Sequence, residues 1–99
     1  MRIIKRKTLT AFYEKHADAE TEMEEWYRKM QKAQWNNFSD VKRTFNTVSS
    51  VGNQRYVFDI KGNNYRIVTI IKFQIKMVYI RFVGTHPEYD KIESKIKNL

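Results

Sequence analysis

Residues 55–83 read RYVFDIKGNNYRIVTIIKFQIKMVYIRFV, and this stretch decides the fold. It is rich in Val, Ile, Tyr and Phe, which favour β-strands, and turn residues interrupt it. Gly62-Asn63 suits a tight hairpin turn, and Gln74-Ile75 marks a second one with weaker turn chemistry. The pattern therefore predicts an antiparallel meander of three strands. These are Arg55–Lys61, Asn64–Phe73 and Lys76–Val83.

Side-chain alternation sets the register of this meander. Closing the hairpins at the two turns places Asp59 opposite Arg66, Ile71 opposite Val78, and Ile67 opposite Phe82. One face of the sheet is then almost entirely apolar and needs a covering layer. That face carries Tyr56, Phe58, Ile60, Tyr65, Ile67, Thr69, Ile71, Val78, Ile80 and Phe82. The opposite face is half apolar, and its five basic residues are Arg55, Lys61, Arg66, Lys72 and Arg81.

The N-terminal half predicts the layer that covers the apolar face. Apolar residues recur at helical spacing in two successive runs, so residues 8–33 are expected to form a helical hairpin capped by Thr8 and Asp18. Three shorter elements complete this half. They are an edge strand at Arg2–Lys5, a short helix at Ser39–Phe45 and a loop at Asn46–Gln54. We expect one α+β domain, residues 1–99, with the hairpin on one face of a small antiparallel sheet.

A short C-terminal helix is expected to follow the last strand directly. Thr85 and, three residues later, Glu88 form a capping-box pattern. His86, Tyr89 and Asp90 are spaced i, i+3, i+4, so they share one face of the first helical turn. Any chemistry of these three side chains would therefore take place beside the end of the strand that carries Arg81.

Charge and composition narrow the function classes. Lys and Arg number 19 and Asp and Glu number 11, giving a net charge of +8, and a domain this basic is expected to bind polyanions, nucleic acid first. The absence of cysteine excludes a disulfide framework, a thiolate zinc site and a cysteine nucleophile. No signal-peptide core or membrane-spanning run is present, so we expect a soluble cytoplasmic protein that does not bind membranes.

Arg66 and His86 are the leading candidates for chemistry. A guanidinium in semi-apolar surroundings recognises phosphate through two parallel hydrogen bonds, although Arg66 could instead simply pair with Asp59. Histidine is the usual proton-transfer group near neutral pH, and a helix start favours its neutral form. The alternative is that His86 is an ordinary surface residue at a helix start. His16 continues an apolar helical stripe and is expected to be structural.

Metal-free RNA cleavage needs a base for the 2′-hydroxyl, an acid for the departing 5′-oxygen and a cation for the phosphorane. The chain supplies these roles with His, Lys, Tyr and Arg. His86 and Asp90 could also ligate a metal, but the dense positive charge argues against a divalent cation. We therefore expect neither a metal nor another cofactor.

Three motifs resemble the HigB toxin family of type II toxin–antitoxin systems. They are G-N-x-x-R (Gly62, Asn63, Arg66), Y-I-R (Tyr79, Ile80, Arg81) and T-H-x-E-Y-D (Thr85, His86, Glu88, Tyr89, Asp90). The resemblance implies a RelE/ParE-like fold and an mRNA endonuclease that works on translating ribosomes. It also implies a HigA-type antitoxin, which is a helix-turn-helix DNA-binding protein. The toxin would then contact operator DNA only through this antitoxin.

The motif positions imply four catalytic residues: Arg66, His86, Tyr89 and Asp90. Six further residues are expected to contact RNA: Arg55, Lys61, Asn63, Lys72, Tyr79 and Arg81. Two other functions remain open, a non-enzymatic toxin of the same fold that poisons DNA gyrase and a simple RNA-binding module. His86 with the arginine-bearing face favours the nuclease, because a gyrase poison needs no proton-transfer groups.

Overall fold

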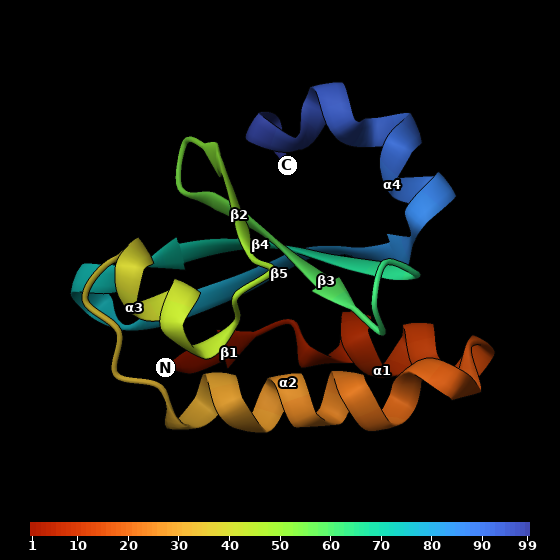
Figure 1. The fold of residues 1–99 in the computed structure, drawn as a ribbon, viewed down its shortest axis with the longest axis horizontal. Coiled ribbons are helices and arrows are strands. Elements are labelled where there is room, and N and C mark those ends of the chain that lie inside the picture. The colour runs from red at the N-terminus through yellow and green to blue at the C-terminus, as the bar shows by residue number, and fades with distance from the viewer.

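A five-stranded sheet forms the centre of the molecule in the computed structural model, which describes residues 1–99 (Figure 1). Its strands are β1 (Arg2–Ile4), β2 (Ser49–Gly52), β3 (Arg55–Ile60), β4 (Tyr65–Lys72) and β5 (Met77–Thr85). Their order across the sheet is β1-β5-β4-β3-β2. The predicted meander and edge strand are confirmed, but β1 runs parallel to β5, so the sheet is mixed rather than purely antiparallel.

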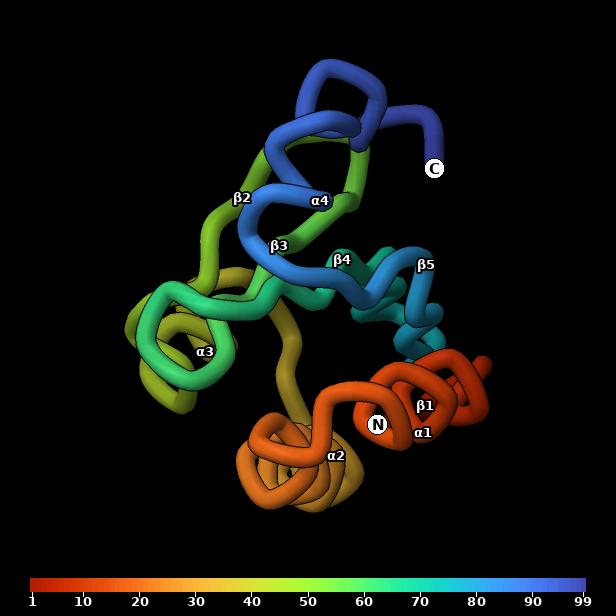
Figure 2. The backbone as a smooth tube through the Cα atoms, turned by 90° about the vertical axis from the view of Figure 1, so that its right-hand side faces the viewer, coloured from red at the N-terminus to blue at the C-terminus, as the bar shows by residue number.

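Helices cover both faces of this sheet (Figures 1 and 2). They are α1 (Arg6–Lys15), α2 (Glu20–Lys32), α3 (Phe38–Thr44) and α4 (His86–Ile92). Three 3₁₀ turns accompany them, at Ala17–Ala19, Phe73–Ile75 and Glu93–Asn98. The predicted helical hairpin, the short helix before β2 and the α+β class are confirmed. None of the helices has the length and apolar character needed to traverse a bilayer.

The two predicted caps of the helical hairpin are wrong. Helix α1 begins at Arg6, two residues before Thr8, and its N-cap Lys5 has a left-handed backbone without a side-chain cap. The Asp18 carboxylate caps no helix; it accepts a hydrogen bond from the Tyr65 hydroxyl at 2.6 Å and pairs with Lys61 at 3.3 Å. The Asp18 carboxylate thus binds side chains of the sheet instead of the backbone N–H groups at the start of a helix.

The main hydrophobic core lies between the helical hairpin and the predicted apolar face of the sheet. It contains 16 buried residues, and Trp26 meets Phe58 edge-on with ring centroids 5.4 Å apart. Fully burying one such side chain contributes about 1.5–3 kcal/mol. Every apolar residue of the predicted face belongs to this core or packs against it except Phe82.

The exception arises from a β-bulge in β5. The predicted pairs Asp59–Arg66 and Ile71–Val78 are confirmed, but the predicted pair Ile67–Phe82 is wrong. Ile67 instead pairs with Val83, because Arg81 is an extra residue between the two halves of the ladder. The one-residue shift turns the Phe82 side chain to the opposite face and brings Val83 against the main core.

A second, smaller core lies on that opposite face. Val57, Val68 and Ile96 are buried there. The partly buried residues packed around them are Val51, Phe82, Tyr89 and Leu99. Helix α4 and the turn after it therefore cover part of the basic face that the sequence predicted to be open.

The loop predicted at Asn46–Gln54 is partly wrong, because it contains β2. This strand of Ser, Val and Gly pairs with β3 at the sheet edge. Its composition carries little strand signal, but the outer backbone groups of β3 need hydrogen-bond partners. Asn53 and Gln54, with φ of 51° and 65°, then form the turn into β3.

Candidate active site

The start of α4 is fixed in place by local and tertiary hydrogen bonds. The Thr85 hydroxyl accepts from the Glu88 backbone N–H, and the Glu88 carboxylate accepts from the Thr85 N–H at 2.7 Å, which confirms the capping box. The hydrogen bond from the Thr85 backbone lowers the pKa of Glu88. The His86 backbone N–H donates to the Asn64 carbonyl at 2.9 Å, so the first turn of α4 is held against the β3–β4 turn.

His86 and Asp90 form a side-chain pair on this first turn, as their spacing predicted. His86 Nδ1 lies 3.0 Å from an Asp90 carboxylate oxygen. When Nδ1 carries the shared proton, the neutral imidazole keeps Nε2 as its proton acceptor. The His86 side chain is 36% exposed, so this ring is accessible to a substrate.

Arg66 is buried on β4 and is held by several partners. Its Nη1 donates to the carbonyls of Asn63 and Tyr65 at 3.2 and 3.3 Å, and its Nη2 donates to the Asn63 side chain at 2.5 Å. Its Nε lies 3.1 Å from the Asp59 carboxylate, so the alternative partner suggested by the sequence is present. Nη2 makes a single hydrogen bond, to the Asn63 side chain, so its second hydrogen has no protein acceptor.

Tyr89 connects Arg66 to α4. The Arg66 guanidinium carbon lies 5.5 Å from the centre of the Tyr89 ring, within the range of a cation–π contact. Burial raises the pKa of the Tyr89 phenol and the Glu93 carboxylate raises it further, while Arg66 partly opposes both. The phenol therefore stays protonated at neutral pH, where it can donate a proton or a hydrogen bond.

The four residues predicted to be catalytic thus gather at one end of the sheet, on β4 and the first turn of α4. This arrangement combines a histidine with a carboxylate partner, a protonated phenol and a guanidinium. The set can transfer protons and stabilise a phosphate. No three His, Asp or Glu side chains converge in a way that could hold a metal ion.

Comparison with known proteins identifies the family. The sequence profile of HigB toxins, described as the RelE-like toxic component of a toxin–antitoxin system, matches residues 19–92. The chain belongs to the HigB toxin family. A relative named mRNA interferase toxin HigB, from Escherichia coli K12, is 30% identical over 92 residues, which cover 91% of this chain and 88% of the relative. The mRNA interferase HigB of Shigella flexneri matches with the same identity and coverage.

The residues predicted to contact RNA in this HigB-family toxin do not all lie together. Asn63 belongs to the site through its contacts with Arg66, and Arg81 is exposed at the β5 bulge. Lys61 sits at the same end, but its ammonium pairs with Asp18 at 3.3 Å on the side of the helical hairpin.

The other predicted RNA contacts lie toward the opposite end of β3, β4 and β5. Arg55 donates to the backbone oxygens of Asn53 and Leu99 at 2.9 and 2.5 Å. Lys72 bonds to the side chain of Gln54, and the Tyr79 hydroxyl lies 3.7 Å from the sulfur of Met77. The structure therefore separates the predicted basic face into two regions linked by β4 and β5.

Gly84 is a supporting residue that the sequence reasoning missed. It pairs with Arg66 across the sheet, and an added Cβ would lie 2.4 Å from the Phe82 ring and 3.1 Å from the Glu88 carboxylate. Only glycine fits this close approach without a shift of the Phe82 ring. A glycine inside a strand pattern is a signal for such a place and could have identified it.

His16 takes no part in the pair formed by His86. Its ring stacks on Phe12 with centroids 4.3 Å apart and meets Tyr65 edge-on at 5.8 Å. This packing agrees with the structural role that the sequence predicted for His16.

Proposed function

We propose that this HigB-family toxin cleaves mRNA by attack of a ribose 2′-hydroxyl on the adjacent phosphate. The curated relatives carry the name mRNA interferase. The observation that carries the proposal is the His86–Asp90 pair on the same helical turn as Tyr89, whose ring contacts the Arg66 guanidinium. A non-enzymatic toxin needs no partnered histidine in such a set.

The proposed reaction has a role for each of the four residues. A bond forms between the 2′-oxygen and phosphorus while the bond from phosphorus to the 5′-oxygen breaks, which yields a 2′,3′-cyclic phosphate and a 5′-hydroxyl. His86 takes the proton of the 2′-hydroxyl at Nε2, and Asp90 holds the ring in the required tautomer. The Tyr89 phenol gives a proton to the 5′-oxygen.

Arg66 supplies positive charge to the phosphorane in this proposal. The single Nη2 hydrogen that lacks a protein acceptor is the donor assigned to the phosphate. Arg81, exposed at the bulge in the neighbouring strand, is assigned to a further phosphate of the RNA. Asn63 positions Arg66 and does not itself touch the reacting atoms.

We further propose that the toxin acts in the cytoplasm on mRNA held by translating ribosomes. The net charge of +8 supports steering toward ribosomal RNA and toward an acidic partner. The proposed inhibitor is a HigA-type helix-turn-helix antitoxin that covers or neutralises the basic surface, or blocks ribosome entry. Contact with operator DNA would then occur through the antitoxin alone.

Mapping of RNA ends tests the proposed activity. Purified toxin is added to translating ribosomes, and in a second arm to free mRNA with excess chelator. We expect new ends with 2′,3′-cyclic phosphates for the wild-type protein and none for His86→Gln. Lys7→Gln, a charge change on the exposed part of α1, serves as the control that keeps cleavage. Intact RNA in both arms together with loss of gyrase supercoiling would identify a gyrase poison instead.

A further inference from the structure

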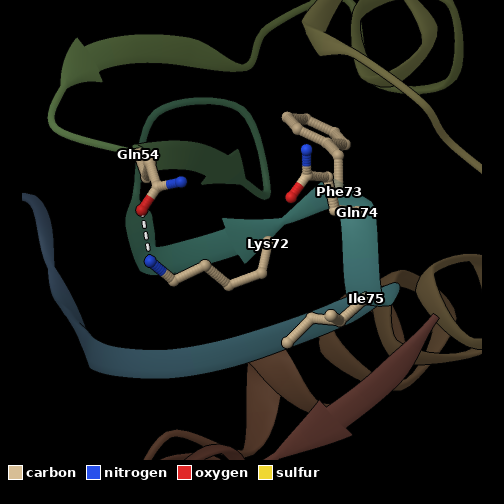
Figure 3. A pocket seen from close by; sticks show the side chains of 5 residues that line it. All are labelled: Gln54, Lys72, Phe73, Gln74 and Ile75. Atoms are coloured by element: carbon tan, nitrogen blue, oxygen red, sulfur yellow. Dashed lines mark hydrogen bonds between the residues drawn. The ribbon is translucent and has the colours of Figure 1, made fainter.

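A hollow lies at the far end of β4 from the candidate active site. This open hollow has a volume of about 490 Å³. This volume falls within the range of about 300–1,000 Å³ that is usual for small-molecule sites. Five residues from the β2–β3 turn and the β4–β5 turn line it: Gln54, Lys72, Phe73, Gln74 and Ile75 (Figure 3).

The lining combines the groups that recognise a nucleotide. Figure 3 shows the Lys72 side chain extended toward Gln54, whose amide oxygen accepts a hydrogen bond from its ammonium. Gln54 and Gln74 offer two amides that can read a base edge, and Lys72 offers a cation for a phosphate. Ile75, at 59% exposure the one exposed large hydrophobic side chain of the chain, offers an apolar surface to a base.

The hollow is aligned with the candidate active site along one strand. Lys72 lies six residues from Arg66 on β4, and an even separation places both side chains on the same face. At about 3.3 Å per residue the two lie about 20 Å apart, a span of several nucleotides of single-stranded RNA. Figure 1 shows the start of α4 and the β4–β5 turn at opposite ends of these strands.

The neighbouring strand offers contacts between the two regions. Tyr79 pairs with Ile70 on β4 and is half-buried, so its ring can stack with a base. Arg81 follows at the bulge, closer to the α4 end. A cation, an aromatic ring and a second cation therefore succeed one another along β4 and β5, a pattern typical of surfaces that follow a single strand.

We propose that this hollow is a nucleotide subsite that holds the mRNA several nucleotides from the cleaved bond. Lys72 contacts a phosphate, the amides of Gln54 and Gln74 contact the base edge, and Ile75 packs on the base. The proposal rests on the proposed function for the identity of the natural ligand, but binding at the hollow can be measured without cleavage.

Two substitutions at exposed positions remove one of the two amides and the apolar surface of the hollow. Gln54 has a φ of 65°, and Gln54→Gly removes the amide at a backbone conformation that glycine adopts without strain. Ile75→Ala truncates an exposed side chain. Phe73 is left unchanged because it packs against the main core. Lys7→Gln on α1 is the charge-matched control for Lys72→Gln.

The probes are uncleavable 2′-O-methyl oligonucleotides of three and eight residues, titrated into the 99-residue protein. Side-chain amide resonances of Gln54 and Gln74 are followed by NMR, and affinity is followed by fluorescence anisotropy. We expect the eight-residue probe to shift both resonances. In the Gln54→Gly/Ile75→Ala protein we expect about tenfold or greater loss of affinity for this probe and little change for the three-residue probe. Lys72→Gln should lower the salt slope by about 0.7, whereas Lys7→Gln should leave it unchanged.

Each failure has a distinct meaning. Resonance shifts confined to the Arg66 and His86 end, no shifts at all, or equal losses for both probes would overturn the subsite. Unchanged RNA affinity with weakened antitoxin binding would also overturn it and assign the hollow to a protein partner. Wild-type protein that binds the long probe at the hollow but cuts no mRNA would leave the subsite standing and refute the proposed function.

Discussion

His86→Gln is expected to abolish cleavage while hardly changing stability. The His86–Asp90 pair is a surface pair, with the two side chains 36% and 51% exposed, and such pairs contribute about 0–1 kcal/mol. A domain of this size shifts its melting temperature by roughly 4–8 °C per kcal/mol, so the change should not exceed about 8 °C. Loss of a general acid–base group slows a reaction about 10²–10⁴-fold, equivalent to about 3–5 kcal/mol of barrier.

The assay compares single-turnover cleavage of ribosome-bound mRNA with thermal unfolding of the same preparations. Asp90→Asn keeps the size of the partner but removes its charge, so its loss of rate should be smaller than that of His86→Gln. His16→Gln is the matched control, because it makes the same chemical change in the stacked ring at the C-cap of α1. We expect it to lower the melting temperature more than His86→Gln does while keeping cleavage near the wild-type rate.

Two results would refute this reasoning. If His86→Gln cuts mRNA at the wild-type rate, His86 is a helix-start residue without a role in proton transfer. Proton transfer would then pass to Tyr89 or, failing that, to Lys61. If His16→Gln loses cleavage without losing stability, the proton-transfer group lies at the C-cap of α1 instead of on α4.

Four further outcomes follow from the structure. Arg66→Ala should abolish growth arrest and, by leaving the Asp59 carboxylate unpaired, lower the free energy of unfolding by about 1–3 kcal/mol, measured by growth and by urea unfolding. Gly84→Ala places a methyl group 2.4 Å from the Phe82 ring and should cost about 1–3 kcal/mol in the same unfolding assay. Folding raises the pKa of Tyr89. The protonated phenol therefore contributes its full stability below about pH 10, and this stability is lost as the pH rises through the pKa of the folded protein. Thermal melts of Tyr89→Phe should show a smaller loss of stability at alkaline pH. Association with ribosomes should weaken steeply with salt in sedimentation assays.

Each of these four predictions can be contradicted by a specific result. An Arg66→Ala protein that is less stable but still toxic would assign Arg66 to the pair with Asp59 alone. Unchanged stability of Gly84→Ala would show that the Phe82 ring moves aside freely. If Tyr89→Phe loses as much stability at alkaline pH as the wild-type protein, the loss comes from the other tyrosines whose pKa is raised. Ribosome association that is insensitive to salt would contradict electrostatic steering.

Local patterning was sufficient for much of the architecture and for part of the site. Alternation through residues 55–71 predicted the β3–β4 register, because a one-residue slip would expose an entire apolar face. Helical spacing predicted the hairpin of α1 and α2. The capping box and the i, i+4 pair of His86 with Asp90 were also predictable, since both depend on neighbours within one helical turn.

Features that depend on contacts between distant segments could not be predicted in this way. The bulge at Arg81 shifts the face of Phe82, because Phe82 packs against Ile96 on a segment whose position no local pattern reveals. Strand β2 forms because the edge of β3 needs backbone partners, although its own composition is that of a loop. Asp18 does not cap a helix because its carboxylate accepts a hydrogen bond from the Tyr65 hydroxyl at 2.6 Å.

At the candidate active site, the burial of Arg66 is the clearest example of a feature that depends on contacts between distant segments. Its sequence neighbours indicated an arginine on an open basic face, with Asp59 as an alternative partner. Only the packing of α4 over β4 and β5 places the Tyr89 ring on the guanidinium and leaves Arg66 8% exposed. The type and spacing of a residue specify the interactions it can make. Its solvent exposure depends on every segment that packs around it, and these segments are brought together only when the chain folds.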